Sequence, residues 1–117
     1  MAQYEGPNRR RFRRAAVDFP VTVILPGQEL VIEGRALDLS AGGLRVATLS
    51  DLPAGQSIVL RFVLPNSEHE GIVRGRIVLS FFDAAMKQYA HGIAFTRIAP
   101  ESRDEIEKLL DEKNPVA

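Results

Sequence analysis

Apolar and polar residues alternate with a period of two along most of the chain, from residue 17 to residue 98. A period of two sends successive side chains to opposite faces of a β-strand, whereas an amphipathic helix repeats every 3.6 residues. Helical periodicity is missing from this stretch. The pattern predicts a series of short strands that each bury one face and expose the other.

The first half of this stretch predicts a hairpin followed by a turn and a short strand. Val21, Val23 and Leu25 share one face of a strand that should end at the turn pair Pro26-Gly27. A second strand is expected from about residue 30 to residue 37, and a turn over residues 38–43. The short strand after this turn begins with the inward-facing pair Leu44 and Val46.

The second half predicts another hairpin and a last strand. One strand buries Ile58, Leu60, Phe62 and Leu64, and a polar tip at residues 65–70 leads into a strand over residues 72–82. Alternation in that strand predicts inward side chains at Val73, Ile77, Leu79 and Phe81, and outward side chains at Arg74, Arg76 and Ser80. The last strand, about 89–98, sets Ile93 and Phe95 inward.

The pattern changes to a helical one at the end of the chain. Pro100 and Glu101 are typical of a helix start, and Ile106, Leu109 and Leu110 form its apolar face, which predicts a helix over about residues 100–113 that caps an open end of the sheet. Six short antiparallel strands favour a closed barrel, because closure removes exposed edges. The expected fold is all-β, a six-stranded antiparallel β-barrel of Greek-key or split type with a C-terminal α-helix.

Composition limits the classes of protein that fit this fold. The chain has 117 residues, 45% of them hydrophobic, which suits one domain with one core. It contains no cysteine, which excludes disulfides and thiolate metal sites and favours the cytoplasm as compartment. It also has no apolar run of about 18 residues, so we expect no membrane insertion.

Charge is distributed unevenly, although the formal net charge is zero. Residues 9–14 contain five arginines, and residues 1–16 show no strand or turn signal, so they are expected to form a flexible arginine-rich arm before a domain at 17–114. A protein that coats nucleic acid usually spreads basic residues over a whole face, but here the isoelectric point is about 6.7. A small anionic ligand fits better.

Two groups of residues can bind such a ligand. Arg10 and Arg14 lie four apart in the arm, and their guanidinium forks suit phosphates and guanine edges. In the turn, Asp38 can accept from guanine N1 and N2, Ser40 can bond a phosphate or an amine, and Gly43 can admit the ligand to the backbone. For the turn alone, side chains that bond nearby backbone amides are a sufficient explanation.

These residues carry a resemblance to a known family. Arg10-Arg11-Phe12-Arg13-Arg14 followed by Asp38-Leu39-Ser40-Ala41-Gly42-Gly43 resembles the signature RxxxR and D/N-x-S-x-x-G of PilZ domains. The segment from His91 to Phe95 is similar to the Gly-x-x-Phe of their late strand, so the resemblance covers nearly the entire chain. It implies a six-stranded barrel that binds cyclic dimeric guanosine monophosphate (cyclic di-GMP), a bacterial second messenger, through arm and turn.

The remaining candidates have weaker support. Arg9 is a lesser candidate for contact with a second, stacked copy of the ligand, while Arg11 and Arg13 are expected to be solvated charges that steer the anion. His69 and His91 are far apart and predict no metal site. The sequence has no G-x-S-x-G elbow or phosphate-binding loop, so we expect no enzyme activity and no cofactor.

The leading hypothesis is a cytoplasmic cyclic di-GMP receptor, monomeric or weakly dimeric, whose arm changes conformation on binding and relays the signal to a partner protein. Two alternatives stay open. One is a protein-interaction adaptor that binds no nucleotide. The other is a barrel that binds single-stranded nucleic acid, although it would lack an aromatic platform: tryptophan is absent, and Tyr4 and Tyr89 are far apart. We therefore expect no nucleic-acid partner.

Overall fold

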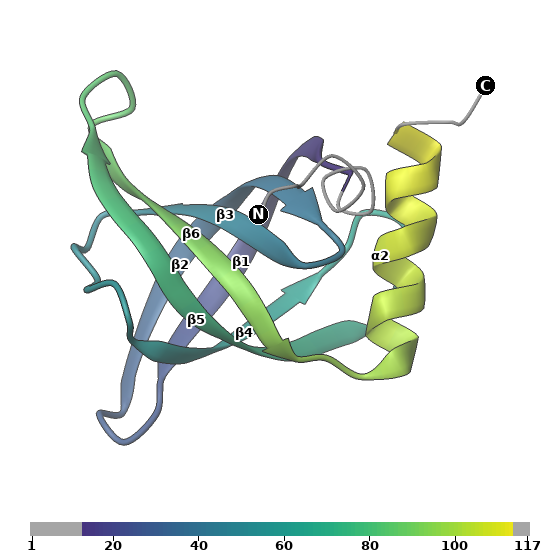
Figure 1. The fold of residues 1–117 in the computed structure, drawn as a ribbon, viewed down its shortest axis with the longest axis horizontal. Coiled ribbons are helices and arrows are strands. Elements are labelled where there is room, and N and C mark those ends of the chain that lie inside the picture. The colour runs from purple at the N-terminus through teal and green to yellow at the C-terminus, as the bar shows by residue number, and fades with distance from the viewer. Residues whose placement is uncertain (1–12, 114–117) are drawn as a thin grey trace, which may run out of the picture.

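The structure is a computed structural model that describes residues 13–113, and its strands close into a single barrel (Figure 1). Around the barrel the strands follow the order β1-β2-β3-β6-β5-β4, and every neighbouring pair is antiparallel. This confirms the predicted fold class. The elements are β1 (Ala15–Leu25), β2 (Leu30–Ser40), β3 (Gly43–Thr48), β4 (Ser57–Val63), β5 (Glu70–Asp83), β6 (Gln88–Arg97) and the helix α2 (Pro100–Lys113).

Both predicted hairpins are present, β1 with β2 and β4 with β5. Two boundaries differ from the expectation. β1 begins at Ala15, so Ala15 and Ala16 belong to the barrel rather than to the arm, because they pair with Leu39 and Asp38 of β2. The turn expected over residues 38–43 is limited to residues 41–42, because β2 and β3 stay paired as far as Ser40 and Gly43.

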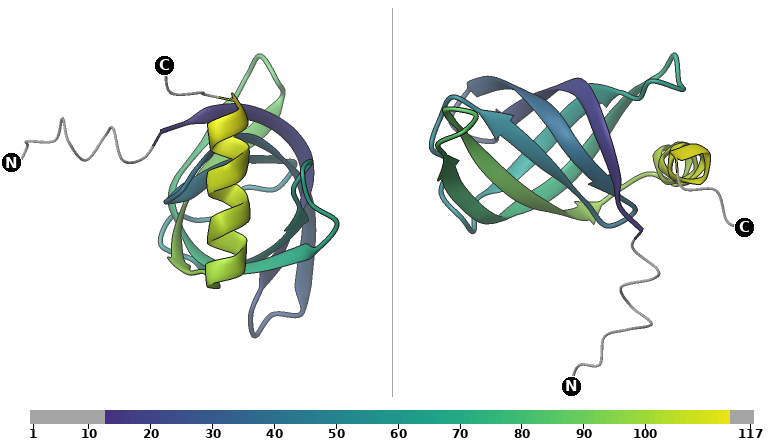
Figure 2. Two further views of the ribbon diagram at one scale, coloured as in Figure 1. Left: turned by 90° about the vertical axis from the view of Figure 1, so that its right-hand side faces the viewer. Right: turned by 90° about the horizontal axis from the view of Figure 1, so that it is seen from above.

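The inward faces of the strands meet in one core, and α2 lies across one end of the barrel (Figure 2). Side chains predicted to be inward on β1, β3 and β4 are buried, and so are Ile106, Leu109 and Leu110 of α2. Burying each such side chain contributes about 1.5 to 3 kcal/mol, so the helix closes the barrel end by covering apolar residues that would otherwise face water. The predicted cap is confirmed.

The prediction for the second half of β5 is wrong. Leu79 and Phe81 were expected inside, but they are 53% and 44% exposed, while Ser80, expected outside, turns toward the buried His91. The register between β5 and β6 shifts between Ile77 and Leu79. An irregularity of this kind inserts a residue into one strand and reverses the inward and outward positions beyond it. Simple alternation therefore fails after Ile77.

Candidate ligand-binding site

Strand pairing brings the two halves of the predicted motif together. Because Ala16 of β1 pairs with Asp38 of β2, the residue just before β1 lies beside the end of β2. Nη1 of Arg14 is 3.4 Å from Oδ2 of Asp38, and the side chains of Arg14 and Asp38 are 63% and 21% exposed. The other predicted arginines, Arg9 and Arg10, lie outside the described residues. Their contact with a ligand therefore stays a prediction.

Arg45 lies beside the motif, and the sequence analysis did not single it out. It pairs directly with Asp38 across β2 and β3, and it is exposed between the buried residues Leu44 and Val46. Paired residues in an antiparallel ladder project from the same face, so Arg45 lies on the outer face that also carries Asp38. Its outward position was predictable from the alternation that follows Gly43, because positions 43 and 45 share a face.

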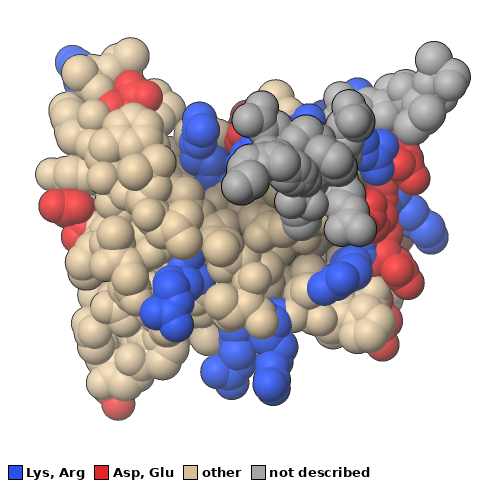
Figure 3. Space-filling view, viewed as in Figure 1, with Lys and Arg blue, Asp and Glu red and all other residues tan. Residues whose placement is uncertain are grey.

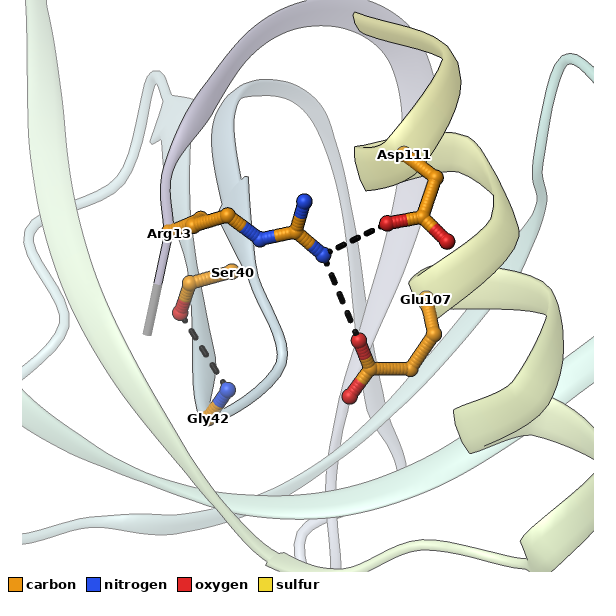
Figure 4. Close-up of polar contacts among 5 residues, drawn as sticks. All are labelled: Arg13, Ser40, Gly42, Glu107 and Asp111. Carbon is orange, nitrogen blue, oxygen red and sulfur yellow. Dashed lines mark hydrogen bonds and ion pairs between the residues drawn. The ribbon is translucent and has the colours of Figure 1, made fainter. Parts of the chain in front are cut away.

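Ser40 holds the turn between β2 and β3. Its hydroxyl accepts a hydrogen bond from the amide of Gly42 at 3.2 Å (Figure 4). The same hydroxyl donates to the carbonyl of Gly43 at 3.4 Å. Ser40 is buried, with only 3% of its surface exposed. These contacts give Ser40 a structural role in shaping the motif, and its contact with a ligand stays a prediction.

Gly43 lies where two strands approach closely. It pairs with Ser40 of β2 and with Ala94 of β6, and a Cβ atom added to it would press against the carbonyl oxygen of Ile93. A backbone carbonyl cannot move aside as a flexible side chain can, so the strand packing itself requires a glycine at this position. The predicted function of admitting the ligand to the backbone would be additional to this packing requirement.

Arg13 connects the start of β1 to the C-terminal helix. Its Nη2 atom lies 2.8 Å from Oδ1 of Asp111 and 3.7 Å from Oε1 of Glu107, both on α2 (Figure 4). The Arg13 side chain is 29% exposed. The expectation that Arg13 is a freely solvated charge is therefore wrong. The helix supplies two carboxylates that no sequence neighbour of Arg13 could offer.

An open groove of about 830 Å³ adjoins the motif between the turn at residues 41–42 and α2. Its volume lies in the range typical of pockets for small ligands. Within residues 13–113, neither Arg97 nor Arg103 forms an ion pair, so two guanidinium groups there are available to an anion. The sequence analysis missed both residues. The groove is lined by Ala41, Gly42, Phe95, Thr96, Arg97, Ile98, Arg103 and Glu107.

His91 is buried, does not line the groove, and has a structural role. Its Nε2 atom lies 2.9 Å from Oγ1 of Thr48, and its Nδ1 atom lies 2.8 Å from Oγ of Ser80. Burial lowers the pKa of His91, and a hydrogen bond at Ser50 and the carboxylate of Asp51 oppose that shift. In the described part of the chain, no three His, Cys, Asp or Glu residues cluster to hold a metal ion.

Comparison with known proteins identifies the family. The family model of the PilZ domain matches residues 8–112, so the chain belongs to the PilZ domain family. A search of curated protein sequences finds no match. Over residues 13–113, no helix has the length and apolar character needed to cross a membrane.

Solved structures show the same fold. The inhibitor of motility MotI/DgrA from Bacillus subtilis is 19% identical with a TM-score of 0.78, over 89% of this chain and 50% of that protein. The PilZ domain of YcgR from Escherichia coli, solved with cyclic di-GMP, is 12% identical with a TM-score of 0.67, over 90% of this chain and 91% of that domain.

MrkH from K. pneumonia, solved as a complex with cyclic di-GMP, is 18% identical with a TM-score of 0.70, over 89% of this chain and 52% of that protein. The chain thus spans about half the length of MotI and of MrkH. At these identities the likeness establishes a shared barrel fold.

Proposed function

We propose that the protein is a non-catalytic receptor for cyclic di-GMP that passes the signal to a partner protein. The observation that carries the proposal is the contact between Arg14 and Asp38, which joins one residue from each half of the PilZ signature. Family membership and the relatives solved with the dinucleotide support the choice of ligand. The absence of cysteine is consistent with the cytoplasm as its compartment.

The chemistry of the ligand suits the charges of the site. Cyclic di-GMP carries two phosphodiester anions and two guanines, and the forks of Arg10 and Arg14 would bind a phosphate and the O6 and N7 edge of a base. Asp38 would accept hydrogen bonds from N1 and N2 of a guanine, which adenine cannot donate in that pattern. Arg45 lies opposite Asp38 and would add a second cation on the same face.

The groove beside the turn at residues 41–42 would hold the rest of the ligand. Arg97 and Arg103 line its walls, and their unpaired guanidinium groups would neutralise a phosphate. Ligand binding has to rearrange the Arg14 and Asp38 pair, but exposed ion pairs contribute only about 0 to 1 kcal/mol, so this cost is small. The contact of Arg13 with α2 would then connect the arm to the helix.

Direct titration tests the proposal. In isothermal calorimetry, cyclic di-GMP should give saturable binding, while GTP and cyclic GMP should bind at least about tenfold more weakly. Gel filtration of the free protein should show a monomer or a weak dimer. A flat titration with cyclic di-GMP would reject the receptor and favour an adaptor that binds no nucleotide.

A further inference from the structure

The outer face formed by β3, β6 and β5 is cationic. These strands carry four arginines that project outward, Arg45, Arg74, Arg76 and Arg97, and two carboxylates, Glu70 and Asp83, which stand at the two ends of β5. The helix α2 has the opposite character, with six carboxylates and three cations. Figure 3 shows blue and tan atoms over the region of β5 and β6, and red atoms gathered over α2 and at the margins. The outer face of β3, β6 and β5 is thus mainly positive, and α2 is mainly negative.

Two of these arginines face each other directly. Arg74 of β5 pairs with Arg97 of β6, and like charges in directly opposed positions destabilise a sheet. Among the described residues no carboxylate pairs with Arg74, Arg76 or Arg45, although Arg35 and Arg61 on other strands each have an acidic partner. This arrangement costs stability in the free protein, and an anion bound beside the two arginines would reduce that cost.

Exposed apolar side chains continue the same surface along β5. Ile72, Val78 and Leu79 are 59%, 58% and 53% exposed, and Phe81 is 44% exposed near the hairpin end. Phe82 points to the opposite face of β5, where its ring contacts Tyr89. The adjoining strand β6 contributes small residues, Gly92 and Ala94, between β3 and β5. This surface combines arginines with exposed aliphatic and aromatic side chains, next to small residues on the adjoining strand. Its composition resembles that of protein interfaces.

We propose that this β5 face, defined as Ile72, Arg74, Arg76, Val78, Leu79 and Phe81, docks an acidic amphipathic segment of a partner protein. The inference rests on the proposed receptor function, because it identifies the surface through which the receptor acts. Carboxylates of the partner segment pair with the arginines, and its apolar side chains cover the exposed isoleucine, valine, leucine and phenylalanine. Over Glu70–Arg76 β5 is paired with β4 on one side, and Arg74 and Arg76 are paired with β6 on the other, so recognition at the arginines uses side chains rather than added strand pairing.

Other anionic surfaces fit less well. A bilayer-inserting hairpin would have an apolar tip without charges, but between β5 and β6 the residues Ala84, Ala85 and Met86 stand between the charged Asp83 and Lys87, and the exposed Phe81 precedes them. A nucleic-acid strand would require phosphate contacts along its whole track, and here the two β5 arginines lie between apolar positions 72 and 78. Interleaved charge and apolar surface favours a protein segment.

The β5 face lies close to the ligand site. Gly43 of β3, Ala94 of β6 and Arg76 of β5 occupy one rung of the barrel. Neighbouring strands are about 4.8 Å apart, so Arg76 is about 10 Å from the motif glycine. A partner segment on the β5 face would therefore run beside the bound dinucleotide, which lets ligand occupancy change the partner's affinity.

The test uses the full chain and a synthetic peptide probe. The probe is an amphipathic peptide of about 16 residues with Leu at helical spacing and Glu elsewhere, and its control replaces every Glu by Gln. The variant R74E/R76E is compared with K108E/K113E on α2, which changes the net charge equally. Binding is measured by fluorescence anisotropy at low and high salt, and folding by circular dichroism.

We expect R74E/R76E to weaken binding of the acidic peptide at least about tenfold, K108E/K113E to leave it within about threefold, and high salt to weaken binding to the wild type. The Gln peptide should bind the wild type more weakly. If R74E/R76E fails to fold, L79S/F81S provides a second test with the same expected loss. Equal binding of the acidic peptide to wild type and charge variant would overturn the proposal.

Further measurements separate the alternatives. Because Arg74 faces Arg97 of the groove, the variant for ligand binding is L79S/F81S, which keeps every arginine. Its cyclic di-GMP affinity should stay within about threefold of the wild type, and a tenfold loss would place the β5 face in the ligand site instead. Stronger binding of oligothymidine or phosphatidylglycerol vesicles through the same arginines, or self-association lost in R74E/R76E, would overturn a partner protein as the occupant. Absence of cyclic di-GMP binding to the wild type would reject the receptor function while the peptide result still stands.

Discussion

Nη1 of Arg14 lies 3.4 Å from Oδ2 of Asp38, so the last arginine of RxxxR contacts the first residue of D-x-S-x-x-G. The pairing of β1 with β2 holds these residues together, because Ala16 and Asp38 are partners in the ladder. A single hairpin therefore brings together two residues that are 24 positions apart in the sequence. Arg14 and Asp38, one residue from each motif, therefore lie close enough to contact the same ligand.

Asp38→Ala should reduce the affinity for cyclic di-GMP at least about tenfold, or 1.4 kcal/mol, because a guanine loses its acceptor for N1 and N2. The free energy of unfolding should change by less than about 1 kcal/mol, since the pair with Arg14 is exposed. Asp18→Ala is the matched control, because Asp18 forms a similar exposed pair with Arg35. Unchanged calorimetric affinity in Asp38→Ala would remove Asp38 from the site.

Arg10→Ala and Arg14→Ala should each lower the affinity at least about tenfold, because each loses a charge-assisted fork to phosphate or guanine. Thermal unfolding of both variants should match the wild type. Arg35→Ala removes one arginine from another exposed pair and should leave the affinity within about threefold, which separates a specific contact from a general loss of positive charge. An equal loss in Arg35→Ala would contradict the assignment.

Gly43→Ala should destabilise the barrel by about 1 to 3 kcal/mol, because the added methyl group presses against the carbonyl oxygen of Ile93. Urea unfolding measures the change. Gly71→Ala is the control on another strand, since the nearest atom to its added Cβ would be Oγ of Ser102 at 3.6 Å, an ordinary contact distance. If Gly43→Ala unfolds like the wild type, the close approach of β3 and β6 does not require glycine.

Stability should depend on pH through His91. Burial lowers its pKa in the folded state below the unfolded value of 6.5, so the folded state favours the neutral imidazole. This stabilisation is complete above pH 6.5 and is lost as the pH falls through 6.5 toward the folded pKa, by at most about 1.4 kcal/mol per pH unit for one proton. Urea unfolding between pH 7.5 and 5, as rough limits of the titration range, should show the decline.

His91→Gln should remove this part of the pH dependence. His69→Gln should retain it, because the His69 side chain is 85% exposed and makes no contact with the core hydroxyls of Thr48 and Ser80. A wild-type protein whose stability is flat from neutral pH to below 6.5 would show that His91 is not the titrating group.

Arg13→Ala should loosen the C-terminal helix with little effect on the barrel. The Arg13 side chain pairs with Asp111 and Glu107, which are 65% and 47% exposed, so the free energy of unfolding should fall by less than about 1 kcal/mol. Hydrogen exchange should accelerate in the last turns of α2 and remain unchanged in β4. Lys108→Ala on the same helix is the control, and equal exchange in all three proteins would show that Arg13 does not restrain α2.

Much of the barrel was predictable from local patterns. Alternation placed Val21, Leu44 and Leu60 in the core, and all three are buried. The helix over residues 100–113 followed from its start signal and apolar face. These predictions hold because each strand or helix must bury one face, and which residues share that face depends only on the local repeat. The repeat failed after Ile77, where the register shift turned Leu79 and Phe81 outward.

The motif residues Asp38, Ser40 and Gly43 were identifiable along the chain because their spacing is local, and so was the outward direction of Arg45. The partners of Arg13 on α2, the opposition of Arg74 and Arg97, and the groove lined by Arg97 and Arg103 were not. Each joins residues from separate elements, and only strand register and closure of the barrel decide which of them meet. Local periodicity determines which way a side chain points, whereas its neighbours depend on long-range pairing that no single segment encodes.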